Sequence, residues 1–136
     1  MIVVDTGVAY AAADRDDPDH PASAQLLAAH PGQLRIPTPV IVETSWLIER
    51  RLGPAAEAGF LRSVRAGEVT RVDLTDDDWD RAVELVESYA DLGLGLVDAS
   101  VVTVAERLGI DTIATLNHRD FRVVRPRHVD AFELIP

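Results

Sequence analysis

The sequence predicts an α/β protein with a mostly parallel sheet of four to five strands and helices on both faces. Short β-branched runs alternate with longer segments whose apolar residues follow helical spacing. Parallel strands need such crossover helices between them. The 136 residues have the usual length of one domain, and no internal repeat or linker divides them. We therefore expect a single domain over residues 1–136.

The chain is expected to begin with strand, helix, helix and strand. The run Ile2 to Val4 is short and β-branched, as buried strands are, and the Ala-rich stretch after Thr6 is typical of a helix. Pro21 suits the first turn of a second helix, and Leu34 to Ile36 offers the second strand. Asp5 then lies directly at the end of the first strand.

Two helices and a third strand are expected next. Pro37 and Pro39 start a helix that Gly53 ends, and Pro54 starts one that Gly67 ends. The first of these helices has its apolar positions at helical spacing: Val40, Ile41, Thr44, Leu47 and Ile48. Residues 69–74 form the third strand of the prediction.

The remainder of the chain is expected to add two helices and two strands. Thr75 and Asp78 resemble a capping box, and the helix they open is expected to turn these residues inward: Trp79, Val83, Val86 and Ala90. Asp98 precedes the next helix, which carries Val101, Val102, Ala105 and Leu108 and stops at Gly109. Strands follow at 111–116 and near 132–135.

The charge and composition exclude several classes of protein. All 13 basic residues are arginine, so P-loop NTPases, protein kinases and Schiff-base enzymes, which need a lysine, are excluded. The net charge of -10 counts against a polyanionic ligand, although carboxylates gathered around a cation would add to that total while attracting phosphate. No apolar run suffices for a membrane span, no cysteine occurs, and MIVVDT lacks the features of a secretory signal, so a cytoplasmic location is expected.

Several acidic side chains are expected at one end of the sheet. In open parallel sheets the reactive crevice lies beyond the carboxyl ends of the strands. Asp5 follows the first strand, and Asn117 and Asp120 follow the fourth. Asp98 begins the helix that leads into the fourth strand, and Glu43 lies early in the helix after the second. We expect these residues to meet there.

Converging carboxylates without cysteine suit a hard cation such as Mg²⁺ or Mn²⁺ better than zinc. Taken singly, each acid also has an ordinary structural explanation, since Asp5 and Asp98 suit helix N-caps, Glu43 suits a solvated helix and Asp120 suits a turn. Glu43 is the most informative of them. It lies within PVIVETSWLI, where an acid between apolar neighbours is not explained by solubility.

These fragments together resemble the PIN-domain family. IVVDT, the isolated Glu43 after a Pro-rich strand end, LVDAS and TLNHRDF occur in the family's order and cover the whole chain. The resemblance implies a PIN-domain-like parallel sheet and an acidic cluster of Asp5, Glu43 and Asp98 that binds Mg²⁺ or Mn²⁺. Thr6 matches a small hydroxyl residue that often follows the first aspartate, and an ordinary first-turn helix residue explains it equally well.

The fourth family position falls on Asn117, where many members carry aspartate. An amide is still an oxygen ligand but removes one negative charge, so a second cation should bind more weakly. A one-metal site with Asp120 as an outer helper then fits better.

The resemblance implies a ribonuclease, specifically a VapC-type toxin of a VapBC toxin-antitoxin pair. It implies metal-activated water attacking a phosphodiester of structured RNA, usually transfer RNA, to leave 5′-phosphates. It also implies a homodimer and a cognate VapB-type antitoxin that masks the acidic site. Apolar helix faces could supply such an interface or belong to the core: Trp46, Leu47, Ile48, Phe60 and Leu61.

Arginines could clamp the phosphates of the RNA or could simply be solvated and paired with acids. One group, Arg119, Arg122, Arg125 and Arg127, follows the fourth motif, and another comprises Arg50, Arg51, Arg62 and Arg65. His118 is dispensable in this mechanism.

Two other classes stay open at this stage. A catalytically degenerate PIN-like module that binds RNA or a protein would be marked by Asn117, but the intact Asp5, Glu43 and Asp98 argue against it. A receiver-like or phosphatase-like domain would use Asp5 covalently, but it lacks the lysine and the second aspartate it would need.

Overall fold

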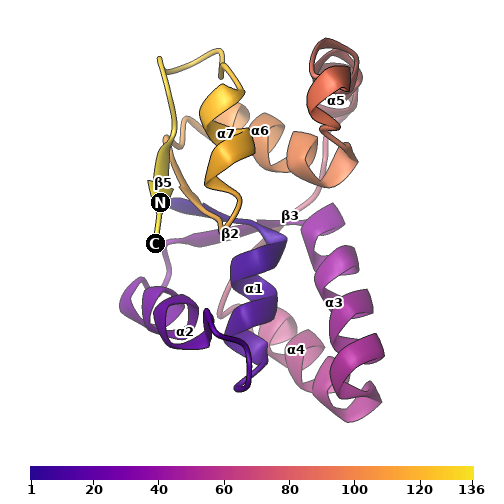
Figure 1. Cartoon of the computed structure of the whole chain (residues 1–136), viewed down its shortest axis with the longest axis vertical. Helices are drawn as coiled ribbons and strands as arrows, with labels where there is room; N and C mark the ends of the chain where they lie inside the picture. Colours follow the sequence, from indigo (N-terminus) through magenta and orange to yellow (C-terminus); the bar gives the residue numbers. More distant parts are fainter.

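The computed structural model describes residues 1–136 as a three-layer α/β/α arrangement (Figure 1). Five short strands form one sheet in the order β3-β2-β1-β4-β5, and every neighbouring pair is parallel. The strands are β1 (Ile2–Val4), β2 (Leu34–Pro37), β3 (Thr70–Val72), β4 (Thr112–Ala114) and β5 (Glu133–Ile135). The predicted fold class is confirmed.

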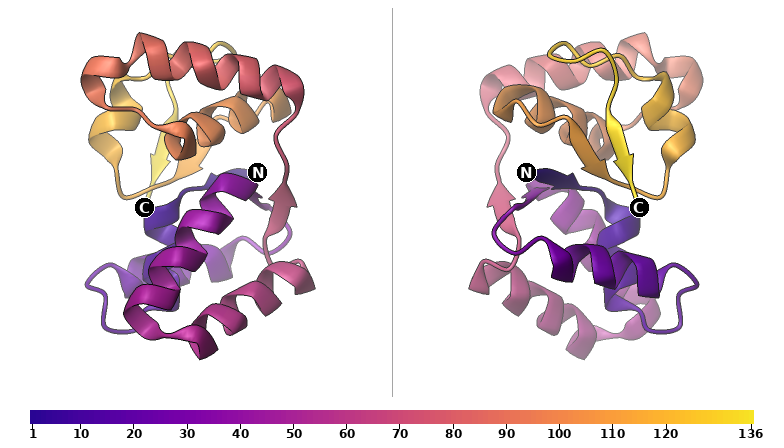
Figure 2. Two further views of the ribbon diagram at one scale, coloured as in Figure 1. Left: turned by 90° about the vertical axis from the view of Figure 1, so that its right-hand side faces the viewer. Right: turned by 90° about the vertical axis from the view of Figure 1, so that its left-hand side faces the viewer.

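Four helices cover one face of the sheet and three cover the other (Figures 1 and 2). The first face carries α1 (Thr6–Ala13), α2 (His20–Ala29), α3 (Thr38–Leu52) and α4 (Pro54–Ala66). The second carries α5 (Asp76–Ser88), α6 (Leu96–Leu108) and α7 (His118–Val123), with a 3-10 turn at Ala90–Leu92. No helix has the length and apolarity that a bilayer crossing would require.

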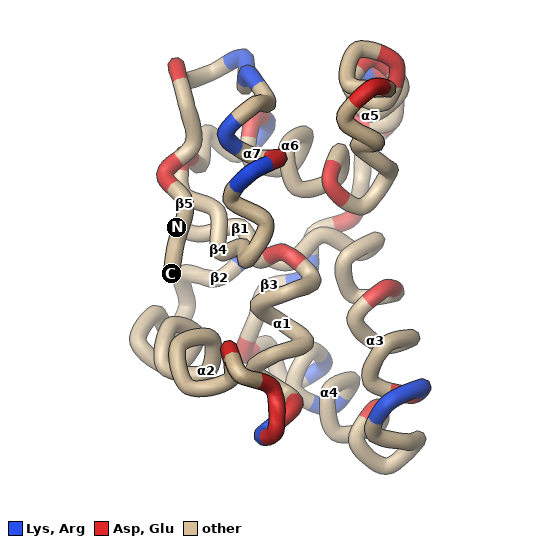
Figure 3. The backbone as a smooth tube through the Cα atoms, viewed as in Figure 1, with Lys and Arg blue, Asp and Glu red and all other residues tan.

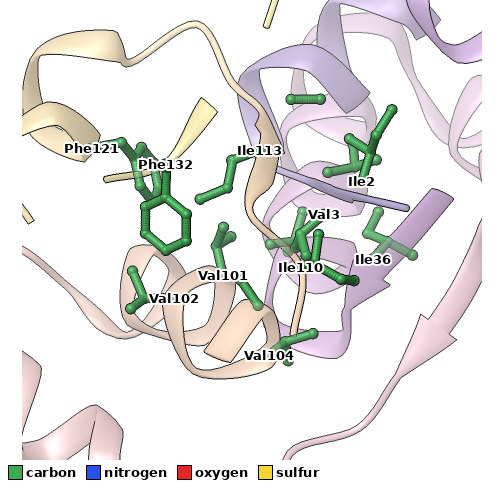
Figure 4. Packing of buried hydrophobic residues seen from close by; sticks show 14 of the residues in the cluster. Ile2, Val3, Ile36, Val101, Val102, Val104, Ile110, Ile113, Phe121 and Phe132 are labelled. Carbon is green, nitrogen blue, oxygen red and sulfur yellow. The ribbon is translucent and has the colours of Figure 1, made fainter. Parts of the chain in front are cut away.

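The core lies on both faces of the sheet because β1 and β4 at its centre are buried from both sides. Between the sheet and the second helical layer, Val101 and Val102 of α6 pack near Ile113, Phe121 and Phe132 (Figure 4). α6 is buried along most of its length, since each residue from 99 to 105 is inaccessible to solvent or nearly so. A helix this apolar all round must lie inside the molecule. The buried body of α6 therefore holds its first turn, which contains Asp98, in a fixed place relative to the sheet.

The expected face of α5 is wrong. The apolar spacing predicts that Trp79, Val83, Val86 and Ala90 turn inward, but all four are exposed, and Ala90 belongs to the 3-10 turn. Asp78, Ala82 and Leu85 form the buried face instead. The capping box explains this orientation, because Asp78 must turn back toward the Thr75 amide and also accepts a hydrogen bond from Arg107 of α6.

The start of α6 and the presence of α7 also differ from the prediction. α6 begins at Leu96, two residues before Asp98, because the extended Gly95 is its N-cap. The segment after β4 forms the short helix α7, where the sequence predicts only a turn. Phe121 within α7 and its C-cap Val124 are fully buried, so packing rather than helical periodicity stabilises this helix.

Candidate active site

Asp5 is held rigidly at the carboxyl end of the central strand. It is the N-cap of α1 and is only 6% exposed. Its Oδ1 accepts a hydrogen bond of 2.8 Å from the Thr6 amide, and its Oδ2 accepts one of 2.8 Å from the Thr115 hydroxyl. Burial nevertheless raises the pKa of Asp5 above its usual range, and the charge of Glu43 adds to the rise. The carboxylate is oriented by these bonds, but no basic side chain neutralises it.

Asp98 lies in the first turn of α6 and is half-buried. Its pKa is raised to about 6, first by burial and then by the charge of Asp5, with smaller contributions from Glu43 and Asp120. A hydrogen bond from the Gly95 backbone opposes this rise. The structure thus brings the predicted residues Asp5, Glu43 and Asp120 within electrostatic reach of Asp98.

Glu43 lies one turn inside α3 and is exposed. Its apolar neighbours Val42 and Trp46 are exposed as well, at 64% and 54%. The apolar sequence around Glu43 therefore marks a surface of α3 rather than a buried environment. None of the ion pairs of the structure involves the Glu43 carboxylate.

Asn117 and Asp120 form a local unit at the start of α7. Asn117 is the N-cap, and its Nδ2 donates a hydrogen bond of 2.9 Å to Asp120 Oδ2. This bond holds the pKa of Asp120 below its usual range, with help from Arg119 at 3.1 Å. Asp120 therefore has a basic partner, whereas Asp5 and Asp98 have none.

Thr115 is the residue that sequence reasoning missed. It is fully buried, donates to Asp5 and accepts the Asn117 backbone amide at 3.0 Å, so it joins the two parts of the site. The feature that places Thr115 is the pairing of β1 with β4. Val4 pairs with Ala114, so the residues that follow them, Asp5 and Thr115, lie side by side. A register cannot be derived from either strand alone.

The residues present fit a hard divalent cation. None of the five ion pairs in the structure involves Asp5, Glu43 or Asp98, so their charges are not balanced by arginine. The hydroxyl of Thr6, beside Asp5, is buried without a hydrogen-bond partner. No group of three or more acidic or histidine side chains is arranged to ligate a single ion. Among the neighbouring carboxylates, Asp5 contributes most to the raised pKa of Asp98, and Glu43 and Asp120 contribute less.

Comparisons with known proteins identify relatives over nearly the whole chain. Residues 2–125 match the PIN domain family. Ribonuclease VapC26 of Mycobacterium tuberculosis is 30% identical over 135 residues, which cover 99% of this chain and 100% of that protein.

Solved structures share the fold. The Mycobacterium tuberculosis toxin VapC20, described as cleaving the sarcin-ricin loop, superposes with a TM-score of 0.76 at 26% identity, covering 83% of this chain and 87% of its own. VapBC2 from Rickettsia felis, bound to a DNA fragment from its promoter, gives a TM-score of 0.68 at 17% identity, covering 98% and 97%.

Proposed function

Because this chain belongs to the PIN-domain family and is a VapC-type ribonuclease, we propose that it hydrolyses RNA with a divalent metal ion at Asp5, Glu43 and Asp98. One observation carries the proposal: Asp98 is a half-buried carboxylate without an arginine partner, and its pKa is raised to about 6 first by burial and then by the charge of Asp5, with smaller contributions from Glu43 and Asp120. A cation there would relieve their repulsion. We further propose that residues 1–136 act as one PIN domain.

The residues have distinct tasks in this proposal. When bound, Mg²⁺ or Mn²⁺ supplies activation of the attacking water and neutralises charge on the phosphate. Asp5 and Asp98 hold the ion, and Thr115 with the Thr6 amide keeps the Asp5 carboxylate in one orientation. Glu43, exposed on α3, acts directly or through water. Asn117 fixes Asp120, which orients groups at the rim of the site.

We propose structured RNA as the substrate class, with transfer RNA as the first candidate. The similarity to VapC20 makes the sarcin-ricin loop of ribosomal RNA the second candidate substrate. Either substrate places the activity in the cytoplasm. The proposed partner is a VapB-type antitoxin, and the similarity to a chain of a VapBC assembly supports it. We also propose a homodimer.

The decisive experiment incubates the purified protein with total transfer RNA and with a sarcin-ricin loop fragment in Mg²⁺ or Mn²⁺. Asp5→Asn and Asp98→Asn should abolish cleavage, and so should EDTA. Asp111→Asn, which changes an exposed aspartate outside the site, is the matched control and should cleave normally. Cleavage that survives EDTA would contradict the metal-dependent proposal. A wild-type protein that binds RNA without cleaving it would support the degenerate PIN-like module.

A further inference from the structure

A row of arginines leads away from the proposed active site along α7. Arg119 and Arg122 lie one helical turn apart on α7, and Arg125 follows directly after it (Figure 3). All three are exposed. Arg122 and Arg125 form no ion pair, and the single ion pair of Arg119 is with its neighbour Asp120.

Most other arginines that the sequence left as candidates have different partners. Arg127 is paired with Glu84, so it does not belong to the row. Arg50 and Arg51 lie over the rings of Trp46 and Tyr10, at 4.8 and 4.9 Å from the ring centroids. Arg62 and Arg65 are on α4, in the opposite helical layer (Figure 3). Of these candidates, Arg119, Arg122 and Arg125 are the ones that lie at α7 and form no ion pair with another helix. Arg125 donates a hydrogen bond of 3.1 Å to the backbone carbonyl of Arg122.

The row begins at the active site. Asn117 caps α7 and contacts Asp120. Because a helix rises about 1.5 Å per residue, Arg122 lies about 7.5 Å along the axis from Asn117. The buried Phe121 and Val124 fix α7 against the core. Arginine positions on a fixed helix can bind successive phosphates of one strand.

We propose that Arg119, Arg122 and Arg125 form a phosphate track that holds the RNA strand on one side of the scissile bond. The inference rests on the proposed function, because it assigns the path of that substrate. The ion pair of Arg119 does not prevent this role: its side chain is 84% exposed, and exposed pairs exchange partners at little free-energy cost. The track contacts phosphates only, so it favours no sequence.

The test measures binding of a short fluorescein-labelled single-stranded RNA by anisotropy, in EDTA, between about 50 and 200 mM salt. Arg119→Ala, Arg122→Ala and Arg125→Ala should each weaken binding roughly fivefold or more at low salt. Each should also reduce the slope of log affinity against log salt by about 0.7, the value for one phosphate of a single strand. Arg62→Ala, an exposed and unpaired arginine on α4, is the control and should leave the slope unchanged.

In cleavage assays Arg122→Ala and Arg125→Ala should raise KM while leaving kcat near the wild-type value, since neither side chain contacts a residue of the proposed site. An unchanged salt slope in all three variants would overturn the proposal, and so would an equal loss in Arg62→Ala, which would indicate only general charge. Normal RNA binding with weakened binding of purified antitoxin would assign the row to a protein contact instead. Because binding is measured in EDTA, the track is tested even if the protein fails to cleave RNA.

Discussion

At the scale of single residues, the charges gathered around Asp98 in the proposed site should repel one another and lower folding stability. Asp5, Glu43, Asp98 and Asp120 were all predicted from their places after strands and at helix starts, and the structure brings their charges together. Thr115 could not be predicted in the same way, because its role depends on a hydrogen bond between residues 110 positions apart. Sequence patterns describe local structure, whereas that contact depends on how β1 and β4 pair.

Removing the charge of Asp98 should stabilise the metal-free protein. Its folded-state pKa of about 6 exceeds its ordinary value, so the folded state binds the proton more tightly than the unfolded state does. Stability is therefore lost as the pH rises from about 4 to about 6. Asp98→Asn should raise the free energy of unfolding at pH 7.5 by about 1 kcal/mol, after discounting for its partial exposure, and change it little at pH 4.

Thermal unfolding in EDTA at the two pH values measures this effect. Added Mg²⁺ should raise the Tm of the wild type more than that of Asp98→Asn, because a ligand stabilises only the state that binds it. Equal stabilisation of both proteins by Mg²⁺ would remove Asp98 from the metal site.

Thr115→Val should weaken the metal site without unfolding the protein. The substitution keeps the volume but removes the hydroxyl that donates to Asp5 and accepts from Asn117. Loss of such a supporting hydrogen bond typically lowers metal affinity by about 10- to 100-fold. Calorimetric titration with Mn²⁺ measures it. Thr115→Ser keeps the hydroxyl and should bind Mn²⁺ nearly as the wild type does, and a matching loss in the serine variant would point to packing instead.

At the scale of elements, the predicted helices agree best with the structure where the sequence contains a capping box or a terminating glycine. The Thr75–Asp78 capping box and the stops at Gly53, Gly67 and Gly109 lie where they were predicted. The short α7 was missed because six residues are too few to show a helical period. The wrong face of α5 shows that a signal for a helix does not determine which side is buried. That choice followed a polar contact with α6.

Asp78→Ala should destabilise the α5–α6 pair more than loss of an ordinary cap does. Asp78 is nearly fully buried, accepts from the Thr75 amide at 3.0 Å and forms an ion pair of 2.9 Å with Arg107. Removing it leaves both donors without this partner, which should lower the free energy of unfolding by about 2–4 kcal/mol. Urea unfolding measures it. Asp77→Ala, in the same turn but exposed, is the control and should differ from wild type by about 0.5 kcal/mol or less.

At the scale of the whole molecule, two exposed apolar rows support the proposed homodimer. Trp79, Val83 and Val86 form one row on α5, and Val42 and Trp46 form the other on α3. Unpaired acids such as Asp76 and Asp80 adjoin the first row, whereas the unpaired Arg50 lies over Trp46 in the second. A two-fold axis would place each α5 row against the α3 row of the other copy, so that opposite charges meet twice.

Val83→Asp should therefore weaken dimerisation by at least about tenfold, since it buries an unpaired charge in that contact. Sedimentation over a range of concentrations measures the dissociation constant. Val123→Asp, on exposed apolar surface of α7, should leave it unchanged. Arg50→Glu and Asp80→Arg should each weaken the dimer and together restore it. A monomeric wild type, or a dimer indifferent to Val83→Asp, would contradict the arrangement.

The central position of β1 in the sheet also has a consequence for synthesis on the ribosome. β1 lies between β2 and β4 in the sheet but is synthesised before both. Asp5 can therefore pair with β4 and accept the hydrogen bond from Thr115 only after residues 112–115 have been synthesised. Contacts so distant in sequence form late and slowly. A nascent chain therefore carries no assembled site of the proposed kind until residues 112–115 have been translated and paired with β1. The proposed nuclease activity should thus be absent during the synthesis of all the residues between β1 and β4.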